Sequence, residues 1–411
     1  MLSHGMSTDK SPGWLCAQIG AREHYAVARA LDLSGNLDAL LTDAWVRPGS
    51  LLGTLQRNLG DRYHSDLAAA SVQSWNAGFV GFELLARAKR ISGWPLMMAR
   101  NRFFQQRVTN AISSLVVKKS SPPVFFAYSY AALEPLRYAK KQGWPTVLGQ
   151  IDPGPAEERL VGKLHQQNKD LNSKWSPAPE TYWKLWREEC DLADHIIVNS
   201  SWSRSALVEE GIAEKKITIV PLAFNPSAAS MEFKRSYPDA FTEKRPLRVL
   251  FLGQVNLRKG MTEVVEAIRQ LKDYPIEFSI VGPLQIEIPE DLRDTPRVRW
   301  LGPVPRSTAP DYYQWADVFL FPTHSDGFGL TQLEAQAWKL PLIASRFCGE
   351  VVEDGKNGWL LPSVTAETIR KRLLHCVLHP ELLAAASTAS GVAGRYSLPY
   401  IGATLSRLVS S

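Results

Sequence analysis

The sequence has few cysteines and no long apolar run. Its four cysteines are scattered with no paired spacing, at Cys16, Cys190, Cys348 and Cys376. That spacing fits neither a zinc site nor a disulfide framework and is typical of a protein of the reducing cytosol. No apolar run approaches the length needed to span a membrane, and residues 1–12 are polar and lack the apolar core of a signal peptide. We therefore expect a cytoplasmic protein.

The chain also lacks internal repeats and low-complexity tracts. Its 411 residues exceed one typical core, so two domains are expected. Hydrophobic content of 45% and charged content of 21% are those of a globular protein. The net charge of +6 permits an anionic partner without identifying one.

One segment, Leu84 to Lys119, contains no acidic residue. Aromatic and apolar residues alternate with its basic residues, which are Arg87, Lys89, Arg90, Arg100, Arg102, Arg107, Lys118 and Lys119. A stretch of this kind can contact an anionic membrane or an acidic acceptor, and it can equally be the solvated face of a helix. Nucleic acid is not expected as a partner, because no recognition motif accompanies the charge.

Apolar segments alternate with helical patterns along the chain, which indicates an α/β fold with parallel sheets. The residues between Pro221 and Pro246 are rich in turn formers and lack periodicity. We place an interdomain linker at 226–246, an N-terminal domain at 1–225 and a second domain at 247–388, followed by a C-terminal helical segment at 389–411.

The most informative stretch runs from Phe321 to Trp338. An apolar run ends at Pro322, a polar turn follows, and a helical pattern begins at Leu330. A strand, a glycine turn and a helix together aim free N–H groups at an anion. Two carboxylates, those of Asp326 and Glu334, belong to this unit. Because they would repel a phosphate, we expect them to bind the hydroxyls of a sugar and a ribose. The candidate residues of the unit are Asp326, Gly327, Phe328, Gly329, Leu330 and Glu334.

Other candidate residues follow other predicted strands. Arg258 and Lys259 stand just before a helix that is predicted to begin at Met261, where two cations and a helix N-terminus suit a diphosphate. Gln254 lies on the same loop. In the first half, Gly20 follows the first strand, and Asp152 follows a later one, at the strand end where open α/β sheets bind ligands.

The second half resembles the retaining, family-4 glycosyltransferases of the two-domain GT-B fold. The resemblance covers about Leu247 to Pro362 and is carried by an ordered set of motifs, which are Gly253, Lys259-Gly260, Val281-Gly282, Leu301-Gly302, Ala316-Asp317, Asp326 to Glu334, Gly349-Glu350 and Asn357-Gly358. It implies two Rossmann-like domains facing across a cleft, with the last helix returning to the N-terminal domain.

The resemblance also implies roles for individual residues. Glu334 would bind the ribose of a nucleoside-diphosphate sugar, and Asp326 would bind the hydroxyls of the sugar. The family has a glutamate where this chain has Asp326, often a basic residue at Gln254, a histidine near Ile151-Asp152, and a richer glycine loop at Gly20.

The implied activity is transfer of a sugar to an acceptor hydroxyl with retention of configuration, needing neither a metal nor another cofactor. The acceptor is not specified by the sequence. A nucleotide-sugar-binding subunit without activity, or a GT-B-fold epimerase or hydrolase of nucleotide sugars, is the alternative.

Overall fold

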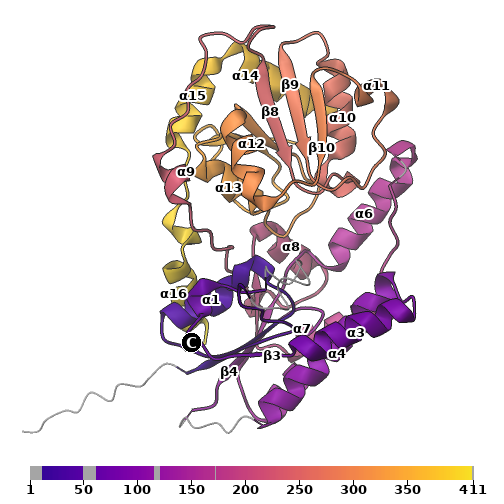
Figure 1. Cartoon of the computed structure of the whole chain (residues 1–411), viewed down its shortest axis with the longest axis vertical. Coiled ribbons are helices and arrows are strands. Elements are labelled where there is room, and N and C mark those ends of the chain that lie inside the picture. The colour runs from indigo at the N-terminus through magenta and orange to yellow at the C-terminus, as the bar shows by residue number, and fades with distance from the viewer. Residues whose placement is uncertain (1–11, 50–61, 115–120, 172, 410–411) are drawn as a thin grey trace, which may run out of the picture.

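The computed structural model describes residues 12–49, 62–114, 121–171 and 173–409. Within them the chain forms two parallel sheets, each flanked by helices, which lie one above the other in Figure 1. The structure thereby confirms the predicted α/β architecture of two Rossmann-like domains.

The first sheet has the strand order β3-β2-β1-β4-β5-β6-β7. Its central strands β1 and β4 are buried along their whole length, as expected for apolar strands covered by helices on both faces. The strands are β1 (Trp14–Gln18), β2 (Leu37–Thr42), β3 (Val72–Ser74), β4 (Val124–Tyr128), β5 (Thr146–Gly149), β6 (His195–Val198) and β7 (Ile217–Ile219). The accompanying helices are α1 (Ala26–Leu33), α3 (Asn76–Ala88), α4 (Gly93–Ser114), α5 (Leu133–Lys141), α6 (Pro155–Gln167), α7 (Glu180–Leu192) and α8 (Ser201–Glu209).

The second sheet has the strand order β10-β9-β8-β11-β12-β13. Its strands are β8 (Leu247–Leu252), β9 (Ile276–Val281), β10 (Val298–Gly302), β11 (Val318–Phe321), β12 (Leu342–Ala344) and β13 (Gly358–Leu360). Its helices are α10 (Met261–Gln270), α11 (Glu290–Arg293), α12 (Ala309–Trp315), α13 (Thr331–Ala337), α14 (Ala366–Leu378) and α15 (Pro380–Ala389).

The last helix, α16 (Leu398–Leu408), packs on the first domain. Its residues Leu398, Ile401 and Leu405 are buried in the same apolar cluster as β1 and α1. The helices approach closely at Gly402, where an added Cβ would lie 2.8 Å from the Ala30 carbonyl oxygen. The chain therefore returns to the N-terminal domain, as the predicted fold requires (Figure 1).

The segment between the sheets is more ordered than the sequence indicates. It contains the short helix α9 (Ala228–Glu232). Beyond it, Arg235 donates to the carbonyl oxygens of Tyr313 and Trp338, and the Tyr237 hydroxyl donates to that of Asp317 at 2.9 Å. These bonds attach the segment to the second domain.

The acid-free segment includes the end of α3 and the whole of α4, which project together from the first domain in Figure 1. Leu84, Leu85 and Met97 are exposed there. Arg100 of this segment is not a free surface charge, because it donates two hydrogen bonds to Glu83, each at 2.6 Å. Lys118 and Lys119 lie outside the described residues. Among the helices that the structure describes, none is long and apolar enough to cross a bilayer.

Strand order fixes where ligands can bind. In each sheet the chain turns back beside its first strand, between β1 and β4 and between β8 and β11. Open parallel sheets bind ligands outside the carboxyl ends of the strands at such a point. In the second sheet that point lies between the loop after Leu252 and the turn after Phe321.

Candidate functional site

The turn after β11 is shaped by its own carboxylate and glycines. Asp326 Oδ1 accepts from the Phe328 amide at 3.3 Å, and Gly329 has a φ of 84°, which favours glycine. The Phe328 side chain is buried against Tyr396, so only its backbone can meet a ligand. Leu330 stands at the start of α13, where the first N–H groups of a helix have no acceptor within it.

The loop after β8 brings Lys259 to this turn. Gly260 has a φ of 76°, and a Cβ there would lie 2.1 Å from the Pro322 carbonyl oxygen, so the two loops touch. The buried Lys259 ammonium forms an ion pair with Asp326 and lies 4.8 Å from the centre of the Phe321 ring. Burial, and secondly the charge of Arg258, lower the pKa of Lys259 to about 7.

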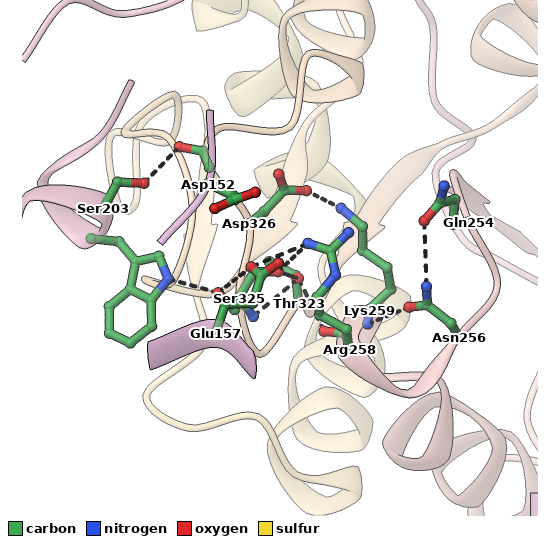
Figure 2. Close-up of polar contacts among 12 residues, drawn as sticks. Asp152, Glu157, Ser203, Gln254, Asn256, Arg258, Lys259, Thr323, Ser325 and Asp326 are labelled. Carbon is green, nitrogen blue, oxygen red and sulfur yellow. Dashed lines mark hydrogen bonds and ion pairs between the residues drawn. The ribbon is translucent and has the colours of Figure 1, made fainter. Parts of the chain in front are cut away.

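Arg258 connects the two domains. Its guanidinium donates to the Ser325 carbonyl oxygen at 2.8 Å and lies 3.5 Å from the carboxylate of Glu157, on helix α6 of the first domain. Glu157 also accepts from the Ser325 hydroxyl at 2.6 Å, and that hydroxyl accepts from the indole N–H of Trp202 at 3.0 Å. Burial raises the pKa of Glu157, although Arg258 opposes the shift. Figure 2 shows Arg258, Lys259, Ser325 and Asp326 gathered at this interface.

Gly327 lies directly against the first domain. A Cβ at this position would lie 2.3 Å from the Ile151 carbonyl oxygen, and the Ser203 hydroxyl donates to the Gly327 carbonyl at 3.5 Å. A side chain at Gly327 would therefore separate the domains. The contact also places Asp152, whose Cα would lie 3.5 Å from such a Cβ, beside the turn (Figure 2).

Glu334 lies apart from the two cations and lines a cavity of about 640 Å³ in the second domain. Its carboxylate accepts from the buried Tyr313 hydroxyl at 2.6 Å and lies 3.9 Å from Arg306. Burial and the nearby Glu334 raise the pKa of Tyr313 well above its ordinary value. Gly253, Gln254 and Gly282 also line the cavity. The hydrogen bond from the Tyr313 hydroxyl holds the Glu334 carboxylate in the lining of this cavity.

Several candidate residues have internal partners. Asp152 Oδ1 accepts from the Tyr130 hydroxyl at 2.5 Å and from the Gly154 amide at 2.9 Å, so it caps the turn into α6. The Gly20 amide donates to Asp43 at 2.8 Å, and Gly20 itself has a φ of 75°. Because the Gly20 amide already donates to Asp43, it is not available as a hydrogen-bond donor to a ligand.

The structure thus brings Arg258, Lys259 and Asp326 together and places Asp152 beside them. Gln254 and Glu334 share the neighbouring cavity, whereas Gly20 lies on the first domain. Sequence reasoning missed Glu157, Arg306 and Tyr313. A signal for Glu157 exists, because Gly154-Pro155 followed by two glutamates is typical of a helix start.

Known proteins resemble this chain in sequence, chiefly over its second half. Residues 246–378 match the family model described as glycosyl transferases group 1. The D-inositol 3-phosphate glycosyltransferase of Corynebacterium urealyticum is 31% identical over 53% of this chain and 57% of that protein. The alpha-monoglucosyldiacylglycerol synthase of Acholeplasma laidlawii is 24% identical over 79% of each chain. The chain spans about half the length of the first curated relatives that it matches.

Solved structures match almost the whole chain. Anabaena Alr3699/HepE in complex with UDP-glucose has a TM-score of 0.61 at 15% identity and covers 96% of this chain and 99% of its own. The catalytic domain of starch synthase IV from Arabidopsis thaliana has a TM-score of 0.64 at 11% identity and covers 97% of this chain and 99% of its own. The fold is therefore that of the GT-B glycosyltransferase structures, as predicted.

Proposed function

We propose that this protein transfers a sugar from a nucleoside-diphosphate donor to an acceptor hydroxyl, with retention of anomeric configuration. The observation that carries the proposal is the meeting of Arg258, Lys259 and Asp326 between β8 and β11, beside the cavity that Glu334 lines. Fixed cations suit a diphosphate, and carboxylates suit the hydroxyls of ribose and sugar. The matching family model and the glycosyltransferases among the relatives support the same activity.

In this proposal the nucleoside occupies the cavity of about 640 Å³, and Glu334 accepts from its ribose. The diphosphate lies against Lys259, Arg258 and the turn from Gly327 to Leu330, whose amides other than that of Phe328, which donates to Asp326, face it. The bond between the anomeric carbon and the diphosphate oxygen breaks, and the leaving group gains negative charge. Preorganised cations and amides stabilise this charge most where water is excluded.

The acceptor oxygen then bonds to the anomeric carbon on the face that the diphosphate leaves. The acceptor proton passes to an oxygen of the departing diphosphate, so the reaction needs no separate protein base. Asp326 holds hydroxyls of the sugar, and Asp152, beside Gly327, faces the acceptor. Because Lys259 and Arg258 neutralise the leaving group, we propose that no divalent metal is required.

The donor site is tested by measuring nucleotide-sugar binding. Thermal shifts with UDP-, GDP- and ADP-sugars identify the base, since a ligand that binds the folded state raises its apparent stability. Lys259→Ala and Glu334→Ala should each weaken binding at least about tenfold, because a charge-assisted contact contributes about 1.5–3 kcal/mol. The matched controls are Lys371→Ala and Glu367→Ala, an exposed pair on α14. Equal affinity in all four variants would refute the assignment.

A further inference from the structure

A second cavity, of about 240 Å³, lies on the first domain beside Arg258. Its walls come from α6, the start of α7 and the start of α4, and the second domain adds Asn256, Leu257 and Arg258. It opens where the proposed diphosphate site meets the first domain. The cavity proposed for the nucleoside, which Glu334 lines, is a separate one.

Aromatic rings form much of its wall. Tyr130 and Tyr182 stack with ring centres 4.9 Å apart, and Trp94 lies 5.0 Å from Tyr182. The Trp94 indole donates to the Ser176 carbonyl at 3.2 Å, and the Trp183 indole donates to Glu158 at 2.5 Å. Because each indole is anchored through its N–H, the rings are held in place as flat apolar surfaces.

Carboxylates complete the lining. Asp152 Oδ1 accepts from the Tyr130 hydroxyl, the Gln150 side chain and the Gly154 amide. Within the part of the chain that the structure describes, Oδ2 of the same residue accepts no hydrogen bond, so it is available to a ligand donor. Glu157 and Glu158 line the same cavity. This set of acceptors suits hydroxyl groups.

Flat rings and carboxylates are complementary to a sugar. The C–H face of a pyranose is apolar and packs on an aromatic ring, while its edge hydroxyls donate to carboxylates. Three carboxylates outnumber the two cations in the lining, Arg258 and Lys174, and Arg258 is paired with Glu157, so a phosphorylated acceptor is disfavoured. An acyl chain would cover Asp152 Oδ2 without supplying it a hydrogen-bond donor, which is costly.

An adjacent cavity of about 440 Å³ shares Tyr130 and Tyr182 with the first. Amide side chains line it, namely those of Asn101, Gln105, Gln106 and Asn110. Amides both donate and accept hydrogen bonds, as hydroxyl groups do. The adjacent cavity is thus suited to further sugar units of the same oligosaccharide.

We propose that the acceptor is a saccharide whose terminal unit binds in the aromatic cavity, with Trp94 and Trp175 as part of its wall. Its place as acceptor rests on the proposed transferase function, whereas saccharide binding does not. Trp175 is 40% exposed and stacks on His165 at 5.5 Å, so its removal leaves the core intact.

The test is binding of the whole protein to a glycan array, without any nucleotide. Wild type should retain oligosaccharides, and Trp94→Ala and Trp175→Ala should each weaken retention at least about tenfold. Trp315→Ala is the matched control, because Trp315 lies under Arg299 on the second domain and lines neither cavity. Retention of no glycan, or equal retention by all variants, would overturn the proposal.

Rival acceptors are tested on the same variants. Binding to diacylglycerol vesicles or to inositol phosphate that is lost in Trp94→Ala, with no glycan bound, would overturn the saccharide assignment. Nucleotide-sugar binding, measured in parallel, should be unchanged by the tryptophan variants. If wild type binds glycans but no nucleotide sugar, the proposed function fails while the saccharide site stands.

Discussion

Glu157 places a negative charge beside a cation that we assign to the diphosphate, and its removal should strengthen donor binding. The carboxylate lies 3.5 Å from the Arg258 guanidinium and accepts from the Ser325 hydroxyl at 2.6 Å. Glu157→Gln keeps the shape and leaves an amide oxygen for Ser325. The change therefore removes a charge and little else.

The magnitude follows from the geometry. At 3.5 Å and an effective dielectric constant of about 20, the Arg258–Glu157 attraction is roughly 5 kcal/mol. The cost of desolvating both ions offsets most of that energy. We expect a net gain of about 1–2 kcal/mol when Arg258 is free to bind a diphosphate, which corresponds to an affinity roughly 5- to 30-fold higher.

The assay is titration calorimetry with the nucleotide sugar that gives the largest thermal shift. Glu158→Gln is the matched control, because Glu158 accepts from the Ala178 amide and the Trp183 indole, both within the first domain. Its donor affinity should equal that of wild type. An unchanged or weaker affinity in Glu157→Gln would refute the view that this carboxylate competes with the diphosphate.

Four further outcomes are expected. Donor affinity should fall as pH rises from about 6 to about 8, because bound diphosphate favours protonated Lys259, whose pKa burial lowers to about 7; an affinity that rises over this range would contradict the assignment. Excess EDTA should leave transfer intact, and complete loss that magnesium or manganese restores would refute metal independence. Asp326→Asn should reduce sugar transfer sharply without lowering nucleoside-diphosphate affinity, because the change also frees Lys259 from its ion pair, and equal loss of both would mean that Asp326 shapes the phosphate turn. Binding to anionic vesicles at low salt should weaken by about 1 kcal/mol for each neutralised residue of the exposed end of α3, and wild type that ignores such vesicles would refute membrane contact; the residues to neutralise are Arg87, Lys89 and Arg90.

The fold could be predicted well where strands are buried on both faces. The apolar runs at 247–252 and 318–321 match β8 and β11 residue for residue. No sequence pattern predicts the residues just before α1, where Glu23, His24 and Tyr25 have left-handed φ values. Half-buried Glu23 accepts from the Tyr128 hydroxyl at 2.8 Å, a contact between distant residues that no local pattern predicts.

Contacts between residues that are distant in the sequence also limit the prediction of the site. The family resemblance predicts one donor site for Arg258, Lys259 and Asp326, and in the structure the loops after the neighbouring strands β8 and β11 bring them together. Glu157 could not be placed there, since it is 168 residues from Ser325 and reaches it across the domain interface. Helix start signals predict that Glu157 lies in the first turn of a helix, and only the packing of the two domains decides which residue it faces.

The central claim, sugar transfer from a nucleotide donor, is tested most directly by identifying the product. The protein is incubated with UDP-, GDP- and ADP-glucose and a mixed pool of oligosaccharides, and products are analysed by mass spectrometry and NMR. We predict a new glycoside with the anomeric configuration of the donor, formed together with one nucleoside diphosphate. Free sugar or an epimerised nucleotide sugar as the sole product, or no reaction despite donor binding, would contradict the account.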